Sequence, residues 1–117
     1  MKYHGSCHCQ AVKFEFSVAD EITSGVRCNC SICRRKGTLM AGFTLAPEEI
    51  TVTADADALS SYEFRSNVAH HLFCKRCGIH PFHQPMSKPG HYRVNLGCID
   101  ELDSTQLPFE VLDGASI

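Results

Sequence analysis

The stretch VKFEFSV, residues 12–18, decides the fold class of this chain. Apolar and polar residues alternate along it with a period of two, so the apolar side chains share one face and the polar ones share the other. Such alternation is typical of a half-buried β-strand. We therefore expect a strand over residues 12–18 whose apolar face lies on the core.

Other short segments of β character follow, and turn-forming residues such as Ala46-Pro47 and Lys88-Pro89-Gly90 separate them. Only Ser31–Lys36 favours a helical turn. Many short strands without a long helical stripe predict an all-β fold, a sheet sandwich of short antiparallel strands with zinc-binding loops. The further expected strands span residues 39–45, 50–53, 62–65, 69–73 and 92–96.

Length and charge exclude several classes of protein. The 117 residues, 44% of them hydrophobic, suit one globular domain over residues 1–117. No apolar run approaches the ~20 residues that span a bilayer, and the first residues lack the apolar segment of a signal peptide. A net charge of -2 gives no cationic field for nucleic acid or anionic lipid. We expect a cytoplasmic protein that binds neither nucleic acid nor membranes.

The composition is unusual in its eight cysteines and seven histidines. Tight Cys-x-Cys and Cys-x-x-Cys spacings let one turn supply two or more thiolates to a tetrahedral metal ion, as zinc sites require. The main alternative, redox chemistry at a Cys-x-x-Cys pair, would need a βαβ context that the strand pattern does not predict. The cysteines are Cys7 and Cys9, then Cys28, Cys30 and Cys33, then Cys74 and Cys77, and finally Cys98.

Counting thiolates leaves two arrangements open. If the first and last pairs share one ion, the middle three cysteines hold a second zinc with one open coordination position, as in catalytic sites. If Cys98 joins the middle three, both ions are closed by four thiolates. The protein is then a zinc-stabilised binding module, since a saturated ion has no position for substrate. Both arrangements predict two Zn²⁺ per chain.

Three motifs, taken in order, resemble the glutathione-dependent formaldehyde-activating enzyme family, which shares its domain with centromere protein V. They are GSCHC at residues 5–9, CNCSICRRKG at residues 28–37 and FCKRCG at residues 73–78, and the likeness runs from Gly5 to Asp100. The resemblance implies a β-tent fold and a carbon-sulfur lyase that condenses glutathione with formaldehyde to S-hydroxymethylglutathione. It further implies a structural zinc on Cys7, Cys9, Cys74 and Cys77, and a catalytic zinc on Cys28, Cys30 and Cys33.

Two residues depart from the family pattern beside these cysteines. Gln10 stands where many relatives carry glycine, and Asn29 stands where histidine is common. Neither change removes a ligand, but both alter the surroundings of a metal and hence bear on substrate preference. A related enzyme acting on another thiol or aldehyde is therefore a second functional hypothesis. A non-catalytic, zinc-stabilised module that binds a protein partner is the third.

Basic and histidine residues supply the remaining candidates. Arg34 and Arg35 suit a clamp on a substrate carboxylate, of which glutathione has two, while the alternative is a solvated turn whose charges offset the zinc-thiolate centre. Strand alternation would point His8 away from the metal. Candidate general acids, all close to the last cysteine pair or after it, are His70, His71, His80 and His83.

Overall fold

The computed structural model describes residues 1–64 and 68–116, and β-strands dominate them. The expected all-β class is confirmed. The strands are β1 (Lys2–Ser6), β2 (Val12–Ser17), β3 (Gly25–Cys28), β4 (Ile50–Ala54), β5 (Leu59–Tyr62), β6 (His70–Cys74), β7 (Phe82–Gln84), β8 (Arg93–Val94) and β9 (Phe109–Leu112). Short 3₁₀ turns are η1 (Pro47–Glu49), η2 (Leu96–Cys98), η3 (Ser104–Gln106) and η4 (Gly114–Ser116).

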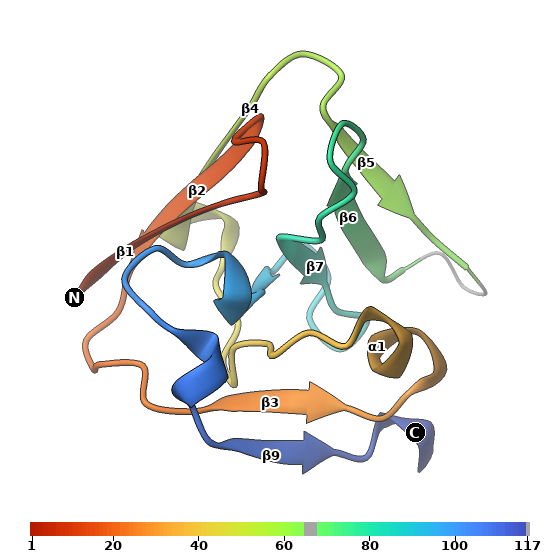
Figure 1. The fold of residues 1–117 in the computed structure, drawn as a ribbon. Coiled ribbons are helices and arrows are strands. Elements are labelled where there is room, and N and C mark those ends of the chain that lie inside the picture. The colour runs from red at the N-terminus through yellow and green to blue at the C-terminus, as the bar shows by residue number, and fades with distance from the viewer. Residues whose placement is uncertain (65–67, 117) are drawn as a thin grey trace.

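The strands form three small sheets (Figure 1). One sheet has the order β1-β2-β4 and another β5-β6-β7-β8, and all neighbours within them are antiparallel. These two sheets lean toward each other and converge at one end of the molecule, while β3 and β9 cross the opposite end. The pair β3-β9 is parallel, which differs from the expected antiparallel strands. Parallel partners need a long connection, and here β9 returns from the far end of the chain.

The predicted alternation places β2 at the centre of the core. Phe14 and Phe16 are buried, whereas Lys13 is exposed. The Phe14 ring meets the ring of Phe82 edge to face, with 5.7 Å between centroids, so the apolar faces of the two larger sheets join there. Gly5 of β1 lies opposite Phe14, and a Cβ at Gly5 would overlap the phenyl ring. Gly5, the glycine of the GSCHC motif, is therefore needed for close packing.

The strand expected over residues 39–45 is absent as a continuous element. Met40 forms isolated bridges to Val26 on one side and Asn95 on the other, and Leu45 forms another bridge to Tyr92. The apolar composition that predicted a strand reflects burial instead, since this segment runs through the core between β3 and β8.

Several further strands differ from expectation: β1, β3 and β7 were not predicted, and the strand expected over residues 92–96 is shortened to β8. The strand expected at residues 62–65 lies earlier, as β5, because Leu59 is in register with Cys74 and Tyr62 with His71. Arg65 lies outside the described residues. Sequence periodicity did not predict β9, whose four residues are all exposed and carry no alternation of burial.

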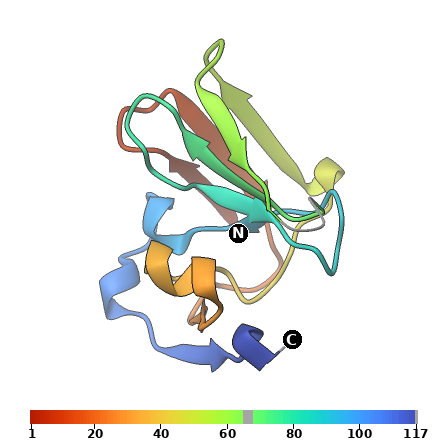
Figure 2. The ribbon, with the colours of Figure 1, turned by 90° about the vertical axis from the view of Figure 1, so that its right-hand side faces the viewer.

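The helical turn expected at Ser31–Lys36 is confirmed as α1, which lies between the two larger sheets and β9 (Figure 2). Cys30 is the N-cap residue, and its Sγ accepts a hydrogen bond from the Cys33 N–H at 3.5 Å. Gly37 ends the helix with a φ of 66°, a left-handed conformation that glycine adopts without strain. Among the described residues no helix has the length and apolar character needed to cross a membrane.

Candidate metal centres

Four cysteines meet where the two larger sheets converge, and we call them the four-cysteine group: Cys7, Cys9, Cys74 and Cys77. They come from the turn after β1 and from the end of β6 with the turn that follows it, which lie side by side (Figure 1). Their Sγ atoms all lie within 4.8 Å of one another, and the Cys9 Sγ is 3.7 Å from those of Cys7 and Cys74. Thiolates about 2.3 Å from a tetrahedral zinc would be about 3.8 Å apart. The spacing therefore fits one tetrahedral ion.

Backbone N–H groups surround the sulfur atoms of the four-cysteine group. The Val12 N–H donates to the Cys7 Sγ at 3.4 Å. Burial raises the pKa of Cys77, but hydrogen bonds from the backbone of Cys9 and Ile79 and from the thiols of Cys74 and Cys7 together outweigh it and bring the pKa to about 6. Cysteine binds a metal as the deprotonated thiolate, so these backbone amides favour the form of the side chain that binds a metal.

Tight turns follow both cysteine pairs. Gly78 has a φ of 80°, and its N–H donates to the Cys74 carbonyl at 2.8 Å. Gln10 has a φ of 67° and donates to the Cys7 carbonyl at 3.2 Å. A left-handed conformation costs a non-glycine residue on the order of 1 kcal/mol, which gives the physical reason that glycine suits position 10. His8 lies exposed in this turn rather than on a strand, contrary to expectation.

A second cluster, the three-cysteine group, contains Cys28, Cys30 and Cys33, whose Sγ atoms also lie within 4.8 Å of one another. Cys28 ends β3, Cys30 caps α1, and Cys33 lies within α1. Burial raises the pKa of Cys30, but hydrogen bonds from the Cys33 N–H and from the thiols of Cys33 and Cys28 together outweigh it and lower the pKa overall. Burial raises the pKa of Cys33 to about 12, against the attraction of Lys36. Three thiols in this spacing fit three positions of a tetrahedral ion.

Lys36 lies on α1 three residues after Cys33 and is held by two imidazoles. Its Nζ is 3.1 Å from the His71 Nδ1 and 3.1 Å from the His80 Nε2. The His80 Nδ1 is 2.5 Å from the Leu72 carbonyl and donates to it, which leaves Nε2 as an acceptor for the ammonium. The sequence singled out these histidines as acids and missed their role as acceptors for Lys36.

The histidines named as candidate acids fall into two sets. His71 and His83 have ring centroids 5.6 Å apart, and His80 and His83 stack at 6.0 Å. Burial and the charge of Lys36 lower the pKa of His71 to about 4, that of His80 to about 3 and that of His83 to about 2. These three are therefore neutral at pH 7. His70 instead faces Glu63, with 3.2 Å between Nδ1 and Oε2.

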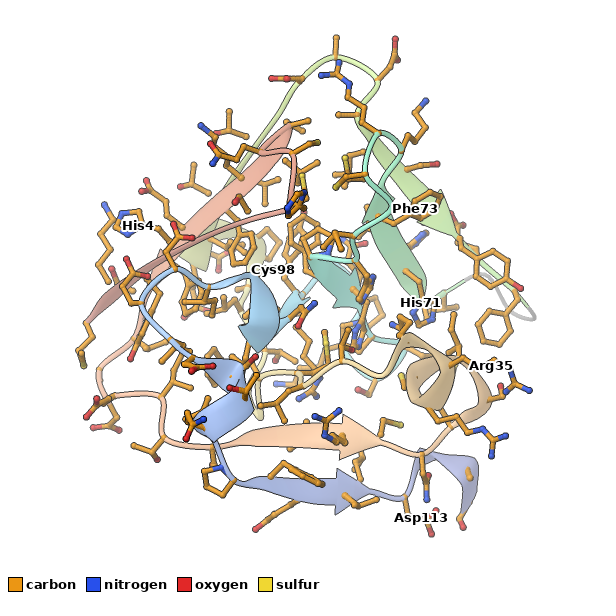
Figure 3. The ribbon with its side chains drawn as sticks, in the orientation of Figure 1. His4, Arg35, His71, Phe73, Cys98 and Asp113 are labelled. Atoms are coloured by element: carbon orange, nitrogen blue, oxygen red, sulfur yellow. The ribbon has the colours of Figure 1, made fainter. Side chains whose placement is uncertain are left out.

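The two candidate clamp arginines point in different directions. Arg34, together with Arg27, lines a hollow of about 260 Å³ that also borders Cys28 and Cys33. Arg35 lines a different hollow and points away from the body of the protein (Figure 3). Only Arg34 of the predicted pair thus lies beside the three-cysteine group, and Arg27 joins it there.

Asn29 fastens the C-terminal residues over the three-cysteine group. Its Nδ2 donates to the Asp113 Oδ1 at 3.0 Å, and its Oδ1 accepts from the Ala115 N–H at 2.9 Å. Between these bonds lies Gly114, where a Cβ would overlap the Cys28 Sγ. Asp113 marks this segment in Figure 3. Sequence reasoning missed the contact because residues 113–116 contain no metal-binding motif.

Cys98 belongs to neither group among the described residues. It lies on η2, and its Sγ is 4.0 Å from the His80 carbonyl oxygen (Figure 3). Burial raises its pKa to about 12, and the negative charges of Cys7 and Cys77 act in the same direction. Cys98 is thus a half-buried thiol that lies in neither cluster in this structure.

These features define an all-β protein with two cysteine groups, one of four and one of three residues, each spaced to hold a metal ion. A family model described as glutathione-dependent formaldehyde-activating enzyme matches residues 2–111. The chain belongs to this family.

Curated relatives of the chain include proteins of Talaromyces marneffei and Pyrenophora teres, both provisionally named glutathione-dependent formaldehyde-activating enzyme. Over 78 residues they are 28% and 30% identical to the chain; the match covers 65% of the chain, and 41% and 40% of these relatives. The chain thus spans about two fifths of their length. A crystal structure of a Rhodobacter sphaeroides protein is 34% identical, with a TM-score of 0.78 over 94% of this chain and 100% of that one.

Proposed function

We propose that this protein is a zinc-dependent carbon-sulfur lyase that condenses glutathione with formaldehyde to S-hydroxymethylglutathione and catalyses the reverse cleavage. Membership of the family supports the reaction. One observation carries the catalytic role: three cysteines gather at α1 without a fourth among the described residues, whereas four gather in the other group. An ion with three protein ligands keeps a position for substrate. We assign one structural and one catalytic Zn²⁺ per chain.

The chemistry that zinc supplies when bound at the three-cysteine group is acidification of an incoming thiol, whose sulfur then attacks as a thiolate. Three thiolate ligands leave a net charge of about -1 on such a centre, which favours a soft sulfur ligand. A carbon-sulfur bond forms as the carbonyl π bond breaks, and the oxygen takes up a proton to balance the one that the thiol lost. The protein contributes by holding two small reactants together, which replaces a bimolecular encounter.

Arg34 is the proposed clamp for a glutathione carboxylate, with Arg27 beside it. Both line the hollow next to Cys28 and Cys33, and guanidinium groups bind carboxylates with two parallel hydrogen bonds. Replacing Arg34 by alanine should raise KM more than it lowers kcat. The matched control is Arg35→Ala, because Arg35 lines the other hollow and should leave KM nearly unchanged. An unchanged KM in both variants would rule out Arg34 as a carboxylate clamp.

The proposed reaction is tested by exchange NMR spectroscopy with ¹³C-formaldehyde and glutathione at equilibrium. The zinc-loaded protein should speed the exchange between formaldehyde and S-hydroxymethylglutathione above the uncatalysed rate. Cys30→Ser should lose this acceleration and keep its fold, because serine is also a good N-cap for α1. Wild-type protein that holds two zinc ions and gives no acceleration would overturn the proposal for this pair of substrates.

A related enzyme acting on another thiol is the second candidate function. Asn29 and the segment it holds support it, because Gly114 packs against Cys28 beside the proposed substrate position. The same exchange experiment with cysteine or coenzyme A in place of glutathione distinguishes the two functions. A larger increase in the exchange rate with another thiol than with glutathione would favour this second function.

A further inference from the structure

Two half-buried cations lie beside the three-cysteine group. Lys36 shares a face of α1 with Cys33, since residues three apart on a helix are neighbours. Its ammonium is fixed by the imidazoles of His71 and His80, each 3.1 Å away. Burial lowers the pKa of Lys36, and attraction to the three thiolates acts against this. Lys36 is therefore oriented by neutral acceptors and attracted to the sulfur atoms.

The second cation is Arg93 of β8. Its Nη1 donates to the Ala41 carbonyl at 2.8 Å, which anchors the guanidinium inside the protein. Ala41 follows Met40, which is bridged to Val26 of β3, so Arg93 is anchored to the segment beside the strand that Cys28 ends. Burial lowers the pKa of Arg93, and attraction to Cys28 and Cys33 opposes the shift. Within residues 1–64 and 68–116, no carboxylate forms an ion pair with Arg93 or Lys36. Half-buried charges are costly unless an opposite charge lies nearby, and the three thiolates supply it.

The four-cysteine group has different surroundings. Backbone N–H groups reach its sulfur atoms, and the nearby Arg76 is exposed and already paired with Asp55, 3.0 Å from Nη1 to Oδ2. The three-cysteine group, which leaves one coordination position open, therefore differs from the four-cysteine group in having half-buried cations beside it.

We propose that Lys36 and Arg93 set the charge of the three-cysteine centre so that its open position takes an anionic sulfur ligand. This inference rests on the proposed function and names the ligand class of the same site, a small thiol bound as thiolate. A zinc ion with three thiolates carries about -1, and a fourth thiolate brings the charge to about -2. The two cations balance that charge, whereas a neutral ligand would leave an excess of positive charge. His71 and His80 are positioning residues for Lys36.

The test measures ligand binding by cobalt(II)-loaded protein, followed through the visible absorption of the metal. The two probes are β-mercaptoethanol, which binds as an anion and has no carboxylate, and imidazole, which binds as a neutral ligand. In Lys36→Met, affinity for β-mercaptoethanol at constant pH should fall about tenfold or more, while affinity for imidazole should not fall. Lys36→Arg should recover most of the thiol affinity, because the charge is restored. Arg93→Met should behave as Lys36→Met.

The matched control is Arg35→Met, which removes an exposed cation from the same helix and should change β-mercaptoethanol affinity less than about twofold at ~0.15 M salt. An equal loss of affinity for both probes in Lys36→Met and Arg93→Met, or no loss of affinity for either probe, would overturn the proposal.

Wild-type protein gives a second measurement that needs no variant to fold. Its β-mercaptoethanol affinity should change less than about twofold between ~0.05 M and ~1 M salt, because half-buried charges are poorly screened. A steep fall in this affinity with increasing salt would mean that exposed charges cause the effect, and it would overturn the proposal. The outcome is separable from that of the proposed reaction: thiol binding that depends on Lys36, without any acceleration of formaldehyde exchange, would contradict only the proposed function.

Discussion

The two cysteine groups differ in where their cysteines come from. The four-cysteine group joins the turn after β1 to the end of β6, and Cys7 and Cys74 are both buried. The three-cysteine group takes every cysteine from residues 28–33, and all three are half-buried. A metal shared between distant segments would tie the two larger sheets together, so its loss would release tertiary structure. A metal held by one local segment can be lost while the rest of the fold remains.

The largest expected effect follows from this difference. Cys77→Ser should unfold or aggregate the protein, because structural zinc contributes on the order of 10 kcal/mol to small domains. Cys30→Ser should stay folded with about one zinc per chain, since it removes a local ligand and keeps the helix cap. Thermal unfolding and metal content of both variants check the prediction. Similar melting temperatures for the two would refute the division into structural and catalytic groups.

The next effect concerns the C-terminal residues that lie on the three-cysteine group. Gly114→Ala places a Cβ against the Cys28 Sγ and should lower metal affinity at this group by about 10-fold to 100-fold, the range for changes around metal ligands. The four-cysteine group should keep its metal. Competition with a chromogenic chelator measures both affinities. The control Ala115→Gly alters an exposed neighbour, so an equal loss of affinity there would argue for general loosening of the segment.

Cys98 gives a smaller effect and tests whether the three-cysteine group is open. Cys98→Ala should retain two zinc ions per chain and lose about 1 to 2 kcal/mol of stability, because the partly buried thiol acts as a small packing residue against the core. Zinc content and chemical unfolding check this. Recovery of fewer than two tightly held zinc ions would make Cys98 a ligand and close the second site.

The smallest effect concerns the turn of the four-cysteine group. Gln10→Gly should stabilise the folded protein by about 1 kcal/mol, because Gln10 occupies a left-handed conformation. Gly78→Ala is the matched change in the opposite direction, since Gly78 has a φ of 80° and an added Cβ there meets no other atom within 4 Å. Its expected destabilisation is about 1 kcal/mol, measured by thermal unfolding. A melting temperature of Gln10→Gly below that of the wild type would contradict backbone strain at Gln10.

Local patterns predicted the elements that depend on local physics. The alternation over residues 12–18 predicted β2 because one face of the strand is buried and the other exposed. Ser31–Lys36 forms the expected helical turn, closed by Cys30 and Gly37. In contrast, β9 pairs with β3, more than 80 residues earlier, and its exposed face has no alternation of burial. A pairing of that kind has no local signature.

The candidate sites show the same limit. Motif spacing predicted that the cysteines within each motif gather, since each motif forms one turn, whereas the joining of the first and third motifs was implied only by the family resemblance. It could not predict that Lys36 meets His71 and His80, because these contacts join α1 to β6 and to the chain after it. Nor could it predict that Asn29 holds residues 113–116. These contacts around the three-cysteine group come from tertiary packing, which spacing along the chain does not encode.

A crystal structure of zinc-loaded protein, with the anomalous signal of zinc, would distinguish a closed from an open thiolate centre. We expect two zinc positions: one bound by Cys7, Cys9, Cys74 and Cys77, and one bound by Cys28, Cys30 and Cys33 with a water or an added thiol as its fourth ligand. A second zinc whose fourth ligand is Cys98, or no zinc at the three-cysteine group, would contradict this expectation.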